Sequence, residues 1–492
     1  MRWRELISTA AITGGGGSGD PEIRDVVYDS RKASAGAVYV AVPGFKAHGD
    51  MFIGDAIQRG AAAVVSASPQ PSCPVPWARA DDPRAAAGEL ARRLWTPPLD
   101  AMTIIGVTGT NGKTTMAYLF HQLLAELYGR DSAWMLSTIV YRLGAQDRPA
   151  GHTTPESSDV FRLIGQAAVK PRALVMEVSS HSLSLHRIAG LAYDVAIYSN
   201  LTQDHLDFHS TMDAYYQAKK LLFTRYLKQG GTAVINLDDE YGRRLAKETD
   251  GVRCITYGQA DDATVRIVDW NCDGSRTAAN LLINGKTHRM ESKLVGAFNV
   301  YNMTAVCAGA LALRMDMERV CALLGRCSPA PGRMEKVAIG APFSVIVDYA
   351  HTPDALDNVL ATARSLISGR LICVFGCGGD RDRTKRPRMA QAVVRHCHEA
   401  IVTSDNPRTE KPDTIIAEIM QGVPLDFPHW VIADRRAAIA RALSIARPGD
   451  CVVIAGKGHE DYQEVNGVRH HFSDHEVVTE EYDRLASGKV RQ

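Results

Sequence analysis

A glycine-rich stretch with one lysine, at residues 106–115, has the composition of a phosphate-binding loop. It reads Gly-Val-Thr-Gly-Thr-Asn-Gly-Lys-Thr-Thr and lies between an apolar run at 102–105 and a helix-like stretch. Glycines let backbone N–H groups converge on phosphate oxygens, Lys113 places a cation beside the phosphates, and the Thr114 hydroxyl can bind Mg²⁺. The usual spacing needs glycine at position 107, where this chain has Val107, so the loop is a variant. A P-loop hydrolase or kinase of another kind would explain the loop alone.

A carboxylate stands where such a loop needs an acidic partner for its metal. The predicted strand 173–176 runs directly into Glu177, and a second strand, 195–198, runs into the polar stretch 200–207. Open α/β sheets bind ligands beyond the carboxyl ends of their strands. Glu177 is therefore a candidate Mg²⁺ ligand in the same domain as Lys113.

Composition and charge exclude several other classes of protein. The 492 residues are 45% hydrophobic and 23% charged, as in an ordinary globular protein of about three domains. Lys and Arg total 56 against 55 Asp and Glu, so no overall charge attracts nucleic acid or a membrane surface. The ten cysteines form no C-x-x-C pair, the first ten residues lack a signal-peptide core, and no apolar run reaches 18 residues. We expect a cytoplasmic protein without a membrane span.

A basic stretch at 381–388 could suggest nucleic acid, but it lacks interleaved aromatic residues. We interpret it as an anion-binding loop followed by a solvated helix start, and we expect no nucleic-acid partner.

Two proline-bearing seams, at 95–98 and 328–332, divide the chain into three predicted domains, because proline ends regular structure. The domains are 1–98, 99–331 and 332–492. In the middle domain, apolar strands at 103–107, 173–178, 195–198 and 233–236 alternate with amphipathic helical stretches, which predicts a mainly parallel sheet covered by helices. The last domain repeats the pattern with strands at 343–347, 371–375, 400–404 and 452–455, which favours a Rossmann-like sheet. The glycine run 14–17 is interpreted as a flexible loop.

The string T-G-T-N-G-K-T-T after an apolar strand resembles the Mur ligase family, the ATP-dependent amino-acid ligases of peptidoglycan synthesis, which have folylpolyglutamate synthases as relatives. Further motifs follow in the family's order along essentially the whole chain. The resemblance implies an α/β fold of three domains: an N-terminal UDP-binding domain, a central P-loop ATPase domain with a parallel sheet and a C-terminal Rossmann-like, amino-acid-binding domain.

The resemblance implies ATP and Mg²⁺ as ligands. The ATP contacts lie on both sides of the second seam, which implies closure of the third domain over the second during catalysis. The expected ATP contacts are Gly109, Thr110, Asn111, Gly112, Lys113, Thr114, Thr115, Asn299, Arg333 and Asp348. The expected metal ligands are Thr114, Glu177, His205 and Lys219. The expected catalytic residues are Lys113, Glu177, His205 and Lys219. By alignment with the family motif, Lys219 rather than Lys220 is the lysine that CO₂ carbamylates, which turns a cation into a metal-binding anion. Taken alone, two lysines on an amphipathic helix would form a solvated face.

The tetrapeptide Asp405-Asn406-Pro407-Arg408 marks, within the family, members that add meso-diaminopimelate, whereas lysine-adding relatives differ at the Arg position. The chemistry agrees, because meso-diaminopimelate carries a second carboxylate that a guanidinium can bind bidentately. With lysine bound, Arg408 would lose its partner, and such a mismatch can reject a substrate by roughly 10⁴-fold. The resemblance adds Arg381 as a second contact and Gly456 with Glu460 at the distal end of the amino acid, where a carboxylate suits the ammonium group.

The first domain and part of the second are implied to hold the UDP-linked acceptor. The expected contacts are Tyr28, Ser30, Phe45, Lys46, Ala47, Thr153, Thr154, Ser179, Leu185 and Arg187. Two positions depart from the family pattern. Leu185 stands where many relatives have Gln, so a hydrogen bond there must be absent or replaced, and His152 stands where Asn is common.

The resemblance therefore implies a monomeric, ADP-forming ligase that joins meso-diaminopimelate to the γ-carboxylate of D-Glu in UDP-N-acetylmuramoyl-L-Ala-D-Glu through an acyl phosphate. A lysine-adding or folylpolyglutamate-type ligase is disfavoured by D-N-P-R and by the N-terminal domain. A regulatory P-loop ATPase is disfavoured because it would not need an amino-acid site in a separate domain.

Overall fold

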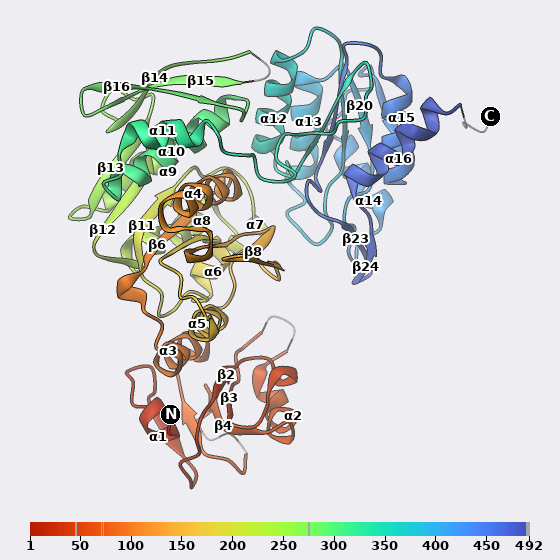
Figure 1. Cartoon of the computed structure of the whole chain (residues 1–492). Helices are drawn as coiled ribbons and strands as arrows, with labels where there is room; N and C mark the ends of the chain where they lie inside the picture. Colours follow the sequence, from red (N-terminus) through yellow and green to blue (C-terminus); the bar gives the residue numbers. More distant parts are fainter. Residues whose placement is uncertain (45–46, 70, 72, 274–275, 489–492) are drawn as a thin grey trace. The chain divides into compact units, whose positions relative to one another are not determined.

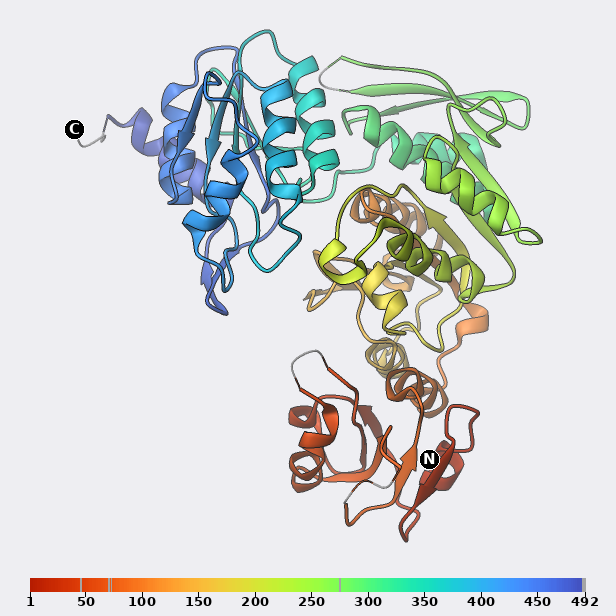
Figure 2. The same cartoon turned by 180° about the vertical axis from the view of Figure 1, so that it is seen from behind.

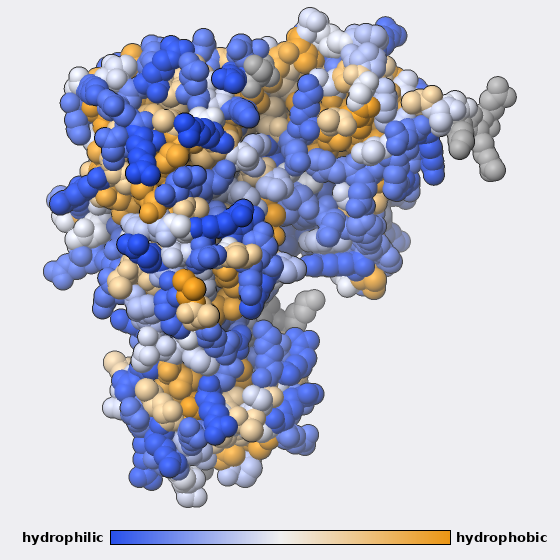
Figure 3. Space-filling model, viewed as in Figure 1, coloured by the Kyte–Doolittle hydropathy of each residue, from blue (hydrophilic) through white to orange (hydrophobic). Residues whose placement is uncertain are grey.

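The computed structural model of the chain describes residues 1–44, 47–69, 71, 73–273 and 276–488. Its contacts define two compact units. The first comprises Met1–Thr108, Leu124–Ala196 and Ala218–Ala233, and the second comprises Gly109–Leu123, Ile197–Gln217 and Val234–Gln492. None of the described helices is both long and apolar enough to cross a bilayer. On the face drawn in Figure 3, hydrophilic residues predominate, with smaller groups of hydrophobic residues between them.

A five-stranded sheet forms within the predicted first domain, in the order β1-β5-β4-β3-β2. Its elements are α1 (Trp3–Leu6), β1 (Gly14–Gly16), β2 (Asp25–Val27), β3 (Ala37–Val40), α2 (Ile53–Gln58), β4 (Ala61–Ser66), β5 (Trp77–Arg79) and α3 (Pro83–Trp95). The flexible loop predicted at 14–17 is wrong for its first three residues, because β1 pairs antiparallel with β5. Backbone groups alone make that pairing, so an all-glycine strand gives no side-chain signal.

An eleven-stranded sheet occupies the predicted middle domain, in the order β16-β15-β14-β13-β12-β11-β6-β10-β7-β8-β9. Its strands are β6 (Thr103–Thr108), β7 (Ala133–Leu136), β8 (Val140–Leu143), β9 (Gln146–Pro149), β10 (Ala173–Glu177), β11 (Tyr193–Tyr198), β12 (Leu227–Asn236), β13 (Arg253–Gly258), β14 (Val265–Cys272), β15 (Thr277–Ile283) and β16 (Lys286–Ser292). The pairs β10–β6, β10–β7 and β13–β14 are parallel, whereas β7-β8-β9 and β14-β15-β16 are antiparallel at the two ends. The sheet is thus mixed, with antiparallel ends that the strand pattern did not reveal.

Helices connect these strands. They are α4 (Lys113–Tyr128), α5 (Ser157–Gln166), α6 (Ser180–Ser184), α7 (Leu206–His209), α8 (Met212–Thr224), α9 (Glu240–Glu248), α10 (Ala297–Ala312) and α11 (Met317–Leu324). All four strands named from the sequence of this domain are present, within two residues at their N-terminal ends except for β12, which begins earlier.

A six-stranded sheet and a hairpin form within residues 332–488, with the sheet order β17-β18-β22-β19-β20-β21. The elements are β17 (Glu335–Lys336), β18 (Ser344–Asp348), α12 (Pro353–Ser365), β19 (Leu371–Phe375), α13 (Lys385–His396), β20 (Glu399–Val402), α14 (Pro412–Met420), β21 (His429–Val431), α15 (Arg435–Ile445), β22 (Cys451–Ala455), β23 (Tyr462–Val465), β24 (Val468–His471) and α16 (Asp474–Ala486). All strands but β17 are parallel in this sheet.

Two cores lie on opposite faces of the six-stranded sheet. Residues of α12, α13 and α14 pack with one face and residues of α15 and α16 with the other, an arrangement seen in Figure 1 and from behind in Figure 2. The central strand β22 is buried at every position, as expected for a parallel strand covered on both faces. The predicted Rossmann-like sheet is therefore present, and it directs the loops after β18, β19, β20 and β22 to one edge.

Candidate active site

The glycine-rich loop adopts a conformation that only glycine tolerates well at two positions. Gly109 has φ +145° and Gly112 has φ +90°. A Cβ atom at Gly109 would lie 1.8 Å from the Oγ atom of Ser199, which donates a hydrogen bond to the Asn111 carbonyl at 2.6 Å. Gly109 and Gly112 are therefore required by close packing as well as by backbone conformation.

Lys113 begins α4 and folds back over the loop. Its Nζ atom donates to the carbonyl oxygens of Gly109 and Thr110, both at 2.9 Å. Thr114 and Thr115 follow in the first helical turn and are buried. The N-terminus of α4 with its helix dipole, together with this ammonium, makes a site for an anion.

A cavity of about 410 Å³ adjoins the loop within the second unit. This volume falls in the range of roughly 300–1,000 Å³ that small-molecule sites occupy. Four segments line the cavity: the glycine-rich loop, the residues after β11, helix α10 and the segment after the second seam. The lining residues include Asn111, Gly112, Thr115, Asn200, Phe298, Tyr301, Asn302, Arg333, Asp348 and Asp354.

Five predicted ATP contacts line this cavity: Asn111, Gly112, Thr115, Arg333 and Asp348. Gly109, Thr110, Lys113, Thr114 and Asn299 are not part of its lining. The Asn299 amide donates to the Val295 carbonyl at 2.8 Å and accepts from Asn302 at 3.1 Å. Asn302 is the residue of this pair that lines the cavity. Asn299 lies one turn earlier on α10 and orients it.

Asp354 is a cavity residue that sequence reasoning missed. It lies in the first turn of α12, where Thr352 caps the helix, and it accepts a hydrogen bond from Asn111 at 2.7 Å. Burial raises the pKa of Asp354. The signal in the sequence is its place in the stretch 348–354, which follows a predicted strand and resembles a nucleotide-side motif of the Mur ligase family.

Arg333 and Asp348 lie together at the cavity. Asp348 accepts backbone hydrogen bonds from Met334 at 2.6 Å and Ala350 at 2.7 Å. Burial raises the pKa of Asp348, while Arg333 and these two N–H groups act in the opposite direction. Arg333 donates to the Oγ1 atom of Thr114 at 3.1 Å, so it reaches a predicted metal-binding hydroxyl.

In the first unit, Glu177 is completely buried at the end of β10 and has both carboxylate oxygens oriented by one residue. Thr138 donates from its backbone N–H to Oε1 at 2.8 Å and from its hydroxyl to Oε2 at 3.1 Å. Thr154 donates to the Glu177 carbonyl at 2.8 Å, and Ser179 N–H donates to Thr154 at 3.0 Å. Thr153 lies 3.2 Å from Thr138. Thr138 was missed because a threonine after a strand is unremarkable without its tertiary contact.

Lys219 is 1% exposed on α8, whereas Lys220 is only half-buried. A solvated lysine face is therefore wrong for Lys219, and its burial singles it out independently of the motif. Its burial distinguishes it from Lys220, as the resemblance to the family motif requires.

In the second unit, His205 has φ +55° and its Nε2 atom lies 3.4 Å from Asp204. Asp204 also lies 3.4 Å from the Lys385 ammonium, and although burial would raise the pKa of Asp204, Lys385 and the two neighbouring histidines lower it strongly. Among the described residues, no three His, Cys, Asp or Glu side chains gather as a metal cluster. A metal here would depend on hydroxyl, carbamate and phosphate oxygens as well.

Predicted acceptor contacts of the first unit gather around two carboxylates. Tyr28 donates to Asp159 at 2.7 Å, and Arg187 lies 3.4 Å from Glu156. Burial, followed by Arg187, lowers the pKa of His152. His152, which stands where Asn is common in the family, is therefore expected to carry a neutral imidazole near Arg187.

The remaining acceptor positions are less engaged. Ser30 is buried at the start of a short 3-10 turn, Ala47 accepts a backbone hydrogen bond from Gly44, and Leu185 is half-buried at the end of α6. Phe45 and Lys46 lie outside the described residues.

The D-N-P-R tetrapeptide and the loop 456–460 form one network in the second unit. Asn406 donates to Glu460 at 2.9 Å and accepts from Lys457 at 3.2 Å. Lys457, which is fully buried, lies 3.8 Å from Asp405. Burial would raise the pKa of Asp405, but Lys457 and Arg435 keep it below its ordinary value. Gly456 has φ +118°, and a Cβ atom there would lie 2.4 Å from Asp405.

Arg408 is held with its guanidinium partly exposed. Arg408 has φ +53°, and its Nη1 atom donates to the Gly379 carbonyl at 2.6 Å. Its backbone N–H donates to the carbonyl of Glu464, in β23, at 3.0 Å. The side chain is 22% exposed. The remaining guanidinium N–H groups suit a carboxylate ligand. Arg381, by contrast, is exposed and donates to the Asp380 carbonyl.

The solvated helix start predicted within 381–388 is wrong for two residues. Lys385 and Arg386 are buried in the first turn of α13, at 4% and 0% exposure. Arg386 pairs with Glu410 and Glu418 at 2.7 Å, and Lys385 pairs with Asp204. The basic composition of the stretch predicted solvent exposure because the acidic partners of Lys385 and Arg386 lie far away in the sequence.

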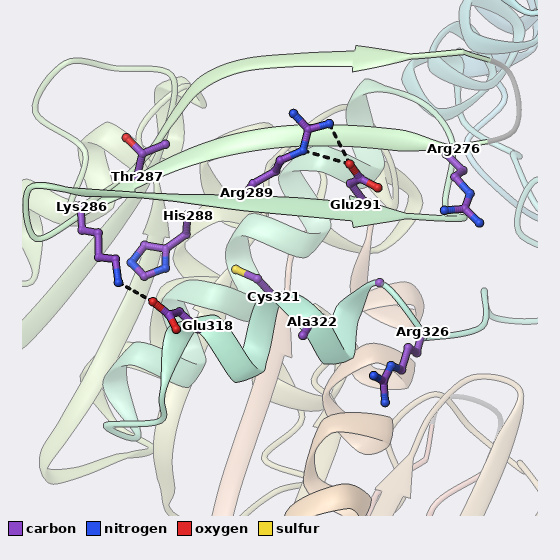
Figure 4. Close-up of a pocket in the computed structure, with 11 residues that line it drawn as sticks. Arg276, Lys286, Thr287, His288, Arg289, Glu291, Glu318, Cys321, Ala322 and Arg326 are labelled. Atoms are coloured by element: carbon purple, nitrogen blue, oxygen red, sulfur yellow. Dashed lines mark hydrogen bonds and ion pairs between the residues drawn. The ribbon is translucent and has the colours of Figure 1, made fainter.

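A second cavity, of about 550 Å³, lies between the β15–β16 hairpin and α11. Lys286 pairs with Glu318 and Arg289 with Glu291 across its surface (Figure 4). These charges are largely exposed, and none of the predicted catalytic residues lines this cavity. It is not the candidate active site.

A phosphate-binding loop between a strand and a helix, with a nucleotide-sized cavity beside it, defines a P-loop nucleotide-binding protein. Three family models match the chain: the Mur ligase middle domain at 107–310, the Mur ligase glutamate ligase domain at 332–458 and the Mur ligase family catalytic domain at 22–95. The chain belongs to the Mur ligase family.

Similar proteins cover the chain almost completely. One from Aquifex aeolicus (strain VF5) is 40% identical over 459 residues, 93% of each chain, and one from Syntrophomonas wolfei subsp. wolfei is 39% identical over 496 residues, 100% of each. Both are named UDP-N-acetylmuramoyl-L-alanyl-D-glutamate–2,6-diaminopimelate ligase. A solved structure of a protein with that name matches with a TM-score of 0.68 and 34% identity over 99% of both chains. MurF ligase from Thermotoga maritima in complex with ADP, at 18% identity and TM-score 0.67 over 95% of this chain and 99% of that one, shares the fold.

Proposed function

We propose that this chain is an ATP-dependent ligase that joins meso-diaminopimelate to the γ-carboxylate of D-Glu in UDP-N-acetylmuramoyl-L-Ala-D-Glu during peptidoglycan precursor synthesis. The observation that carries the proposal is the relationship to ligases of that name, at 40% identity over 93% of both chains in one case. We further propose that it works in the cytoplasm as a monomer.

The reaction needs no protein nucleophile. The D-Glu γ-carboxylate takes the γ-phosphoryl group of ATP, which gives an acyl phosphate and ADP. The amine of meso-diaminopimelate then attacks the acyl carbon, and the tetrahedral intermediate collapses to an amide and phosphate. Negative charge accumulates on phosphoryl and carbonyl oxygens in the transition states. Preorganised cations and N–H groups that stabilise this charge are therefore the main source of catalysis.

Lys113 and the N-terminus of α4 would bind the phosphates, and Arg333, Asp348 and Asn302 would contact the rest of the nucleotide. The Lys113 ammonium now donates to two loop carbonyls. Phosphate oxygens would replace these carbonyls as acceptors at little cost, because the ammonium is already positioned in the loop.

The proposed Mg²⁺ ligands are Thr114 and His205 in the second unit and Glu177 and carbamylated Lys219 in the first. Hydroxyl, carboxylate and carbamate oxygens suit Mg²⁺, and a bound ion would offset charge on the transferring phosphoryl group. Glu177 is buried with both oxygens oriented by Thr138, and Lys219 is buried where a carbamate would be a metal-binding anion.

The amino-acid site would bind the distal end of meso-diaminopimelate. Arg408 would grip its second carboxylate, Glu460 would accept from the distal ammonium, and Arg381 would add a flexible contact. The Glu460 carboxylate is already fixed by Asn406 and lies 3.4 Å from Lys457. The acceptor would lie along Tyr28, Ser30, Thr153, Thr154, Ser179 and Arg187.

Phosphate release from ATP and Mg²⁺, with each of the other two substrates omitted in turn, tests the proposal. A ligase releases phosphate only when the UDP-linked acceptor and meso-diaminopimelate are both present, and mass spectrometry then finds the amide product. Lys113→Met should abolish this release. Phosphate release that needs neither co-substrate would instead identify a regulatory P-loop ATPase.

A further inference from the structure

Three side chains lie close together within the second unit: Arg333, Tyr349 and His459. The guanidinium carbon of Arg333 lies 4.7 Å from the centre of the Tyr349 ring. The rings of Tyr349 and His459 have their centres 5.2 Å apart and are tilted by 43°. Tyr349 therefore contacts a residue of the candidate nucleotide cavity and a residue of the loop 456–460.

At the nucleotide end, few contacts fix Arg333. Its Nη2 atom donates to Thr114 at 3.1 Å, and its buried Nε–H has no hydrogen-bond acceptor among the described atoms. A cation over an aromatic face is held electrostatically by the ring. The direction of the guanidinium thus depends on the Thr114 hydroxyl, the Tyr349 ring and the nearby Asp348 carboxylate.

At the amino-acid end, the backbone at Gly332 packs directly against the backbone of the loop 456–460. Gly332 and Gly458 both have left-handed φ, +64° and +53°. A Cβ atom at Gly332 would lie 2.2 Å from the His459 nitrogen, and one at Gly458 would lie 2.7 Å from Tyr349 Cβ. The Tyr349 N–H also donates to the Gly332 carbonyl at 3.0 Å. A shift of the loop 456–460 must therefore move Tyr349 or the residue preceding Arg333.

Glu460 is the next residue of this loop, and Asn406 holds its carboxylate. When an amino acid binds Glu460, it acts on a loop that is packed against the base of Arg333. Close-packed contacts transmit such a displacement because the interior has little space to absorb it.

We propose that Tyr349 is a positioning residue that couples occupancy of the amino-acid loop to the orientation of Arg333 in the nucleotide cavity. The inference rests on the proposed function, since it requires that both ligands bind. Coupling between two sites is reciprocal, so each ligand changes the affinity for the other by the same factor.

Calorimetry with the full chain, the UDP-linked acceptor and a non-hydrolysable ATP analogue tests this coupling. The dissociation constant of the analogue is measured with and without saturating meso-diaminopimelate. In the wild-type chain and in Tyr349→Phe, which keeps the ring, we expect the amino acid to change this constant by about fivefold or more. In Tyr349→Leu, which removes the ring face, the change should fall below about twofold while both ligands still bind.

Retention of the wild-type factor in Tyr349→Leu would overturn the inference, as would loss of the factor in Tyr349→Phe. If Tyr349→Leu does not melt cooperatively, His459→Ala provides the test instead, because it removes the ring that Tyr349 contacts in the loop 456–460 and should also lower the factor. A wild-type chain that binds the analogue but no meso-diaminopimelate would overturn the proposed function, and the coupling with it. A chain that binds both without coupling would overturn the coupling alone.

Discussion

The side-chain amide of Asn406 donates a hydrogen bond to the Glu460 carboxylate at 2.9 Å and so joins the D-N-P-R tetrapeptide to the loop 456–460. Its amide oxygen accepts from Lys457 at 3.2 Å and from the Glu464 N–H at 2.9 Å. Both ends of the amide are thus bonded within the protein. We expect Asn406 to act on the substrate largely through Glu460.

Replacement of Asn406 by Leu tests this role. The change keeps the size of the side chain but removes its three hydrogen bonds. The one to the charged Glu460 is worth about 1.5–3 kcal/mol. We expect the KM for meso-diaminopimelate to rise by about 10- to 100-fold, with the KM for ATP nearly unchanged. Steady-state kinetics with each substrate varied in turn makes the comparison, and an equal rise in both KM values would contradict it.

Lys219 gives a prediction with a matched control on the same helix. Lys219→Arg should abolish ligation, because a guanidinium does not form the carbamate, whereas Lys220→Arg should retain most activity. Depletion of CO₂ and bicarbonate should lower the activity of the wild-type chain reversibly. Intact-protein mass spectrometry at mildly alkaline pH should find one added CO₂ that is absent from Lys219→Arg. Full activity of Lys219→Arg would exclude carbamylation as a requirement.

The sequence predicted the parts of the site that depend on local order. The phosphate loop, Glu177 at a strand end and the four strands β18, β19, β20 and β22 of the last domain follow from short-range patterns. The partners of these residues, such as Thr138 beside Glu177 and Asp354 beside Asn111, could not be predicted because they are distant in the chain.

The antiparallel end of the eleven-stranded sheet also escaped prediction, for a different reason. Strand β16 is mostly exposed and reads Lys-Thr-His-Arg-Met-Glu-Ser, so it lacks an apolar run. The burial of Arg386 was missed likewise, since its acidic partners, Glu410 and Glu418, lie in another part of the sequence.

The ion pair between Arg435 and Asp474 is fully buried and should matter for stability. Arg435 donates to both carboxylate oxygens, at 2.8 and 2.7 Å, and to the Ala455 carbonyl at 3.0 Å. Asp474→Ala leaves a buried guanidinium without its partner, which costs about 3–5 kcal/mol. The exposed ion pair between Lys286 and Glu318 (Figure 4) supplies the control, because Glu318→Ala should lower the free energy of unfolding by less than about 1 kcal/mol. Thermal unfolding of the two variants compares them, and equal melting temperatures would contradict the prediction.

Acid should destabilise the fold in part through His459. Burial, together with Arg333 and Lys457, lowers the pKa of His459 to about 3, whereas an unfolded histidine titrates near about 6.5. Between these pH values the unfolded chain binds more protons than the folded chain. The contribution of neutral, buried His459 to the free energy of unfolding is therefore fully present above about pH 6.5 and is lost as the pH decreases toward 3.

His459→Gln isolates this contribution. The difference in melting temperature between the wild-type chain and the variant should shrink as the pH is lowered from 7 to 4. Other titrating groups are common to both proteins and cancel in the difference. A difference that stays constant across this window would show that His459 contributes nothing to acid sensitivity.

Arg408 is the residue on which the proposed substrate depends. Its guanidinium is anchored to the Gly379 carbonyl and retains N–H groups for a carboxylate. Loss of a hydrogen-bonded charge partner costs about 2–5 kcal/mol. We therefore expect Arg408→Ala to lower kcat/KM for meso-diaminopimelate by about 10²-fold, and Arg408→Lys to restore only part of it, because an ammonium lacks the bidentate fork.

The most direct test is the ratio of kcat/KM for meso-diaminopimelate to that for L-lysine, measured by phosphate release with the UDP-linked acceptor in the wild-type chain and in Arg408→Ala. A strong preference for meso-diaminopimelate that falls steeply in Arg408→Ala is the predicted result. Equal or better turnover of L-lysine by the wild-type chain would contradict it.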